Sequence, residues 1–110
     1  MAQNFRRYVA RQVGTSAVTL FTADSFDTIV GIALANVTSS EIKVDVILND
    51  ADSSNDVYLI KNAPIIDGQA LQVIDGGAKY VVKSGDVLKV VSDTASSCDV
   101  IVSVVDAISE

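Results

Sequence analysis

The side chains best suited to bind a cation lie in a polar loop that begins at Asp50 in this chain of 110 residues. Asp50, Asp52 and the serine two residues further on have the spacing of the first three ligands of a calcium loop. The pattern then departs from such a loop, because Asn55 stands where glycine makes the sharp turn and Lys61 where a glutamate closes the site. We expect a hairpin turn over residues 50–56, and an irregular calcium site stays open as the alternative.

Catalytic groups are scarce. The chain has no histidine, which excludes histidine-based triads and the commonest general base. Its one cysteine, Cys98, cannot form an internal disulfide or a four-ligand cysteine–histidine zinc site, and we expect it to be a small buried hydrophobe. Most aspartates fall at expected turns and strand ends, where a carboxylate accepts hydrogen bonds from backbone N–H groups. We expect a protein that is not an enzyme, and we assign no catalytic, cofactor-binding or metal-binding residue.

Charge is divided unevenly along the chain. All three arginines lie in the first 23 residues, which contain no acid, whereas residues 24–110 carry five lysines against fourteen acids, a net charge of −9. Such asymmetry is typical of a segment that contacts something anionic. A solvated edge strand and an arm that docks on an acidic neighbour, including a second copy, both fit. Nucleic acid fits poorly, because the acidic body would repel phosphate. The candidate partner interface is Phe5, Arg6, Arg7, Tyr8 and Arg11.

Alternating apolar residues and frequent turn signals predict an all-β fold. The spacing is that of an antiparallel β-sandwich, jelly-roll-like, of about eight or nine short strands with little or no helix. We expect a basic N-terminal arm or edge strand over residues 1–13 and a single β-sandwich domain over residues 14–110. No apolar run approaches the roughly 18 residues of a membrane span, and the N-terminus lacks the apolar core of a secretion signal. The expected strands cover residues 5–13, 17–21, 28–37, 42–48, 56–62, 71–74, 80–82, 87–91 and 98–105.

Three of these segments give more specific expectations. In the first, Val13 falls on the same face as Phe5 and Val9, because the alternation is unbroken. Segments 28–37 and 42–48 are separated by a short polar turn and predict an antiparallel hairpin. Small residues on one face of segment 28–37 indicate close approach by a neighbouring layer or chain. The last segment carries valine and isoleucine on both faces, which predicts a strand inside a sheet with both faces covered.

The order of these segments resembles small virion structural proteins of tailed bacteriophages, of the marine and cyanophage type. The resemblance covers nearly the whole chain and rests on turns and core strands. It implies a β-sandwich that assembles in many copies on a capsid or a tail, and thus a location in the virion after synthesis in the host cytoplasm. It brings no catalytic residue and no cofactor. The matching segments, after the basic Arg-Tyr stretch, are residues 13–16, 32–36, 44–46, 58–64, 83–87 and 97–100.

The resemblance leads us to expect a capsid decoration, or cement, protein that binds the major capsid protein lattice and other copies of itself. We expect the contact to involve segment 5–11 and an apolar face. A tail, neck or fibre-attachment component of the virion is the first alternative. A carbohydrate-binding sandwich is the second, and its only aromatic platforms would be Tyr8, Tyr58 and Tyr80, because the chain has no tryptophan. We expect no nucleic-acid or membrane partner.

Overall fold

The computed structural model describes residues 4–24, 26–74 and 80–106, and within them the chain forms nine β-strands and no helix. This confirms the all-β expectation. No helix in the described residues is long and apolar enough to cross a membrane. The strands are β1 (Asn4–Val13), β2 (Val18–Thr22), β3 (Asp27–Asn36), β4 (Ile42–Asn49), β5 (Asp56–Ile65), β6 (Ala70–Ile74), β7 (Tyr80–Val82), β8 (Val87–Ser92) and β9 (Cys98–Asp106).

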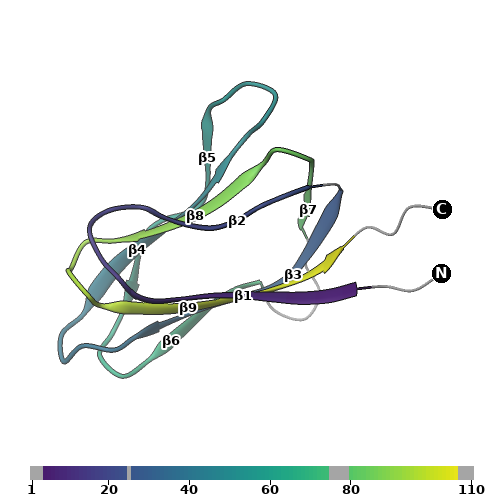
Figure 1. Ribbon diagram of the computed structural model, residues 1–110. Helices are drawn as coiled ribbons and strands as arrows, with labels where there is room; N and C mark the ends of the chain where they lie inside the picture. The colour runs from purple at the N-terminus through teal and green to yellow at the C-terminus, as the bar shows by residue number, and fades with distance from the viewer. Residues whose placement is uncertain (1–3, 25, 75–79, 107–110) are drawn as a thin grey trace.

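The strands form two antiparallel sheets that pack face to face (Figure 1). Sheet A has the order β1-β9-β3-β6, with β7 also pairing with β3, and sheet B has the order β2-β8-β4-β5. Successive strands therefore alternate between the sheets over the first part of the chain, and the last strand lies between the first and the third. This is the connectivity of a jelly roll, in which two Greek keys close a sandwich. The jelly-roll-like sandwich is confirmed.

The core fills the space between the sheets. Sheet A supplies alternate residues of β3 and β9, among them Ile29, Ile32 and Val102, which are almost wholly buried. Sheet B supplies Val46 and Leu88 from its two central strands. Full burial of each such side chain contributes about 1.5–3 kcal/mol. β-Branched residues dominate because they suit the pleated, half-buried surface of a strand.

The predicted hairpin between segments 28–37 and 42–48 is wrong, because β3 belongs to sheet A and β4 to sheet B. The polar segment between them crosses from one sheet to the other and is fixed by Asn36, whose side chain is buried. Its amide nitrogen donates to the carbonyls of Ser40 at 2.7 Å and Ile65 at 2.8 Å. Its amide oxygen accepts from the backbone N–H of Thr38 at 2.8 Å. These bonds satisfy the buried amide and turn the chain into the second sheet.

The last strand is central, as predicted, but within this chain only one of its faces is covered. β9 lies between β1 and β3, and its residues Cys98, Val100, Val102 and Val104 face the core. The alternate residues point away from sheet B, and Ile101 is exposed over 43% of its surface. The expectation that both faces are covered is therefore wrong for the single chain. This exposed side of β9 forms part of the candidate site.

Candidate functional site

The two outer faces of the sandwich differ in chemical character. Sheet B presents charged side chains that pair with one another on its outer side: Lys61 with Asp45 at 3.9 Å and Lys89 with Asp56 at 3.3 Å. The second pair, together with a hydrogen bond from Asn49 at 2.9 Å, lowers the pKa of Asp56, the Asn49 bond being the larger cause. Exposed ion pairs of this kind contribute little stability and are typical of a surface in contact with water.

The outer face of sheet A carries exposed apolar side chains. Phe5 is exposed over 73% of its surface, Val81 over 68%, Val9 over 59% and Ile101 over 43%. Strand register sets them in two rows across the sheet, because Val9 is opposite Ile101, and Phe5 is opposite Val105 in a row that continues through β3 to Val81. Directly opposite side chains in a sheet lie about 5 Å apart. The row of Arg7 and Ser103 lies between these two rows, so the exposed residues form an apolar patch in two parts divided by polar side chains. Several exposed apolar residues on one face are unusual, whereas isolated ones would need no explanation.

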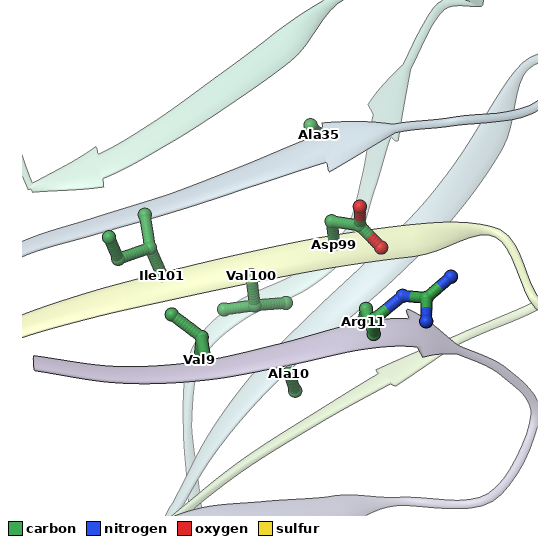
Figure 2. A pocket seen from close by; sticks show the side chains of 7 residues that line it. All are labelled: Val9, Ala10, Arg11, Ala35, Asp99, Val100 and Ile101. Atoms are coloured by element: carbon green, nitrogen blue, oxygen red, sulfur yellow. The ribbon is translucent and has the colours of Figure 1, made fainter.

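Small side chains on β3 leave a depression in this face. In β3, Gly31, Ala33 and Ala35 lie opposite Ser103, Ile101 and Asp99 of β9. A hollow of about 410 Å³ opens beside Ala35, and Figure 2 shows Val9, Ala35 and Ile101 around it with Arg11 and Asp99 at one end. The structure therefore places the small face of segment 28–37 on the outside of sheet A, where no other described strand covers it.

The five candidate interface residues divide between the two faces of β1, which pairs with β9 along its length as the edge strand of sheet A. Phe5, Arg7 and Arg11 lie on the outer face with Val9. Tyr8 faces the core, where its ring stacks on Phe21 with centroids 4.7 Å apart.

The last candidate, Arg6, is exposed and lies opposite Val104 of β9. Among the described residues, neither Arg7 nor Arg11 makes an ion pair or a side-chain hydrogen bond. The outer face thus carries two unpaired positive charges beside its apolar patch. The sequence analysis names the arginines and Phe5 as candidates and includes Val9 only within segment 5–11, and these stay predictions. Ile101 and Val81 are not among its candidates, because their exposure follows from the fold and not from the alternation alone.

The loop at residues 50–56 is a hydrogen-bonded turn. Asp50 accepts from the backbone N–H of Asp52 at 3.1 Å and from the hydroxyl of Ser53 at 3.0 Å. Asp52 pairs with Lys83 at 2.6 Å, and this bond raises the pKa of Lys83. Asp86, which is buried, accepts from the backbone of Ala51 and holds the loop on the sandwich. Within residues 4–24, 26–74 and 80–106, no three Asp, Glu, Cys or His side chains are grouped to hold a metal ion.

Comparison with known proteins shows the fold. No protein-family model and no curated protein sequence matches the chain. Among solved structures, it is similar to a protein of the Bacillus endospore appendages, described as disulfide-linked pili, with TM-score 0.57 and 10% identity over 98% of this chain and 88% of that one. It is also similar to a chain of the T13 viral particle of IBDV, with TM-score 0.56 and 12% identity over 94% of this chain. It spans only 31% of that viral chain.

Proposed function

We propose that this chain is a non-enzymatic structural protein of a bacteriophage virion, a capsid decoration protein that binds the lattice of the major capsid protein. The observation that carries the proposal is the difference between the two outer faces. Sheet B presents paired charges, whereas sheet A presents exposed apolar side chains in two rows together with two unpaired arginines. A patch of this kind, rimmed by polar groups, is typical of a protein–protein contact.

Both structural neighbours come from large assemblies, a pilus-like appendage and a viral particle. They support an assembly role without specifying the particle. The disulfide link of the appendage has no counterpart here, because Cys98 is wholly buried and is the only cysteine. A disulfide between this chain and a partner is therefore not expected, and the apolar patch is the surface best suited to a contact.

A tail, neck or fibre-attachment component would use the same surface and differs from a decoration protein in copy number. The carbohydrate-binding alternative is weakened by the position of the tyrosines. Tyr8 stacks on Phe21, and Tyr80 packs against the core. Only Tyr58 is well exposed, and Lys61 already covers its ring at 4.5 Å. One such ring makes a poor platform for a sugar.

The proposal is tested by adding purified protein to particles that lack it and measuring the bound fraction by co-sedimentation. The double substitution Val9→Ser and Ile101→Ser should reduce binding at least tenfold, because it removes the exposed apolar pair on β1 and β9. Val57→Ser is the control, since Val57 belongs to sheet B and its exposed fraction of 48% lies between those of Ile101 and Val9. Equal binding by both variants would contradict the proposed docking face.

A further inference from the structure

The backbone edges of the sandwich are unequal. β1 keeps an unbroken register with β9 over seven consecutive residues, Asn4 to Ala10, and contains no proline. The edge strand β5 carries Pro64, a left-handed residue at Asn62 with φ of 54°, and two register shifts. The edge strands β2 and β6 each have five residues and one register shift. Prolines, bulges and short length are the devices that keep edges from pairing, and β1 is the edge that lacks them until its bulge at Gln12.

The charge of β1 decides which strand can pair with it. A two-fold pairing of β1 with β1 of a second copy would set three arginines beside three arginines, and like charges directly opposite each other are unfavourable. The strand β6, at the other edge of sheet A, is better suited to pair with β1. Among the described strands β6 pairs with β3, and it contains no charged residue that would repel the arginines. Along the chain Asp67 precedes it and Asp75 follows it, with Lys61 and Lys79 beyond them.

Strand direction also favours this pairing. The path β1-β9-β3-β6 contains four strands, each antiparallel to the next. A second copy placed head to tail in the same orientation therefore brings its β1 antiparallel to β6 of the first copy. The alternation continues across the junction, and the apolar outer faces of the two sheets A lie on the same side.

We propose that β1 of one copy adds to β6 of a second copy of this chain, so that sheet A continues from subunit to subunit. Main-chain hydrogen bonds supply the attraction, as in other cases of strand addition, and the arginines of β1 set the direction. A head-to-tail contact of this kind produces a ring or a filament, not a closed dimer. The inference does not depend on the virion role, because a protein that fails to self-associate could still dock on a particle.

Cross-linking tests which edges meet. Val9 and Gln72 lie in one row of sheet A, through Ile101 and Ala33, and both are exposed. A ¹⁵N-labelled Val9→Cys protein is mixed with unlabelled Gln72→Cys protein and treated with a bis-maleimide, while the native Cys98 stays buried. Mass spectrometry should find the mixed cross-link at several times the yield of either like pair. Predominance of the Val9→Cys like pair would overturn the proposal, as would a higher yield with Val57→Cys on β5.

Hydrogen exchange of the unaltered protein gives a second test that needs no substitution. As protein concentration rises, amides of residues 4–10 and 70–74 should gain protection together, while those of β2 and β5 stay unchanged. Light scattering on the same samples should show species larger than a dimer. A protein that stays monomeric, with exchange in β1 and β6 independent of concentration, would overturn the proposal.

Discussion

Asp99 of β9 accepts a hydrogen bond from the backbone N–H of Gln12 at 2.8 Å, and this bond holds a bulge near the end of β1. Gln12 has a left-handed backbone with φ of 56°. The extra residue shifts the register between Ala10 and Val13, so that Val13 turns into the core instead of continuing the exposed face. The bulge therefore ends the exposed row of Phe5, Arg7, Val9 and Arg11 and anchors it to the sandwich.

Removal of this acceptor should loosen the bulge. We expect Asp99→Ala to lower the free energy of unfolding by about 1 kcal/mol, since one hydrogen bond is lost at an exposed site. Asp99→Asn keeps an oxygen in the same place and should lose less than half as much. Urea unfolding monitored by circular dichroism measures both variants. Equal losses for the two substitutions would show that the carboxylate does not act as the acceptor for Gln12.

Substitution of Asn36 should lower the free energy of unfolding far more, because its buried amide joins the two sheets. Asn36→Ala removes bonds to Ser40, Thr38 and Ile65 and leaves buried backbone groups without partners. The expected loss is about 3 kcal/mol. Thr38→Ala, which removes only the hydroxyl contacts of the same turn, serves as the control and should cost less than half of that. Chemical denaturation checks both, and similar losses would contradict the role given to the buried amide.

Cys98 should be inert in the folded protein. Burial, and to a smaller extent the nearby Asp99 carboxylate, raises its pKa to about 11. Because the thiolate is the reactive form, an aromatic disulfide reagent at pH 8 should not label the native protein but should label it fully in guanidinium chloride. Rapid labelling of the native chain would mean that the end of β9 opens to solvent.

Asp93 should make the free energy of unfolding depend on pH. Hydrogen bonds from the backbone N–H of Lys43 and, secondarily, from the hydroxyl of Thr94 hold its pKa below the ordinary value of 3.8. The unfolded state then binds more protons in this range, so the contribution is complete above 3.8 and disappears as the pH falls through the folded value. The stability difference between the natural protein and Asp93→Asn, measured by urea unfolding, should shrink below 3.8. A difference that stays constant with pH would contradict this assignment.

The sequence predicted most strands within two residues because alternation and turn residues are local signals. The segment 80–82 matches β7, and segment 42–48 falls one residue short of the end of β4. The expected strand 56–62 is too short, because β5 continues through Asn62 and Pro64 to Ile65. Proline weakens a strand prediction, but it is tolerated here because β5 is an edge strand.

Pairing and exposure were harder to predict because both are properties of the whole fold. The Thr38–Glu41 segment has the composition of a hairpin turn, and only Asn36 and its partner carbonyl on Ile65 reveal that it crosses between sheets. The sequence pattern predicts that Ile101 is a core residue, yet its side chain is exposed on the outer face of sheet A. The proposed docking face accounts for the exposed Ile101 on the outer side of β9, which the other described strands do not cover.

The proposed virion role is tested most directly by the copy number of this chain in purified particles, measured by quantitative mass spectrometry against the major capsid protein. We predict a copy number comparable with that of the major capsid protein, as a decoration of the whole lattice requires. A small number per particle would instead place the chain at a tail or neck junction. Absence from the particles would contradict a structural role in the virion.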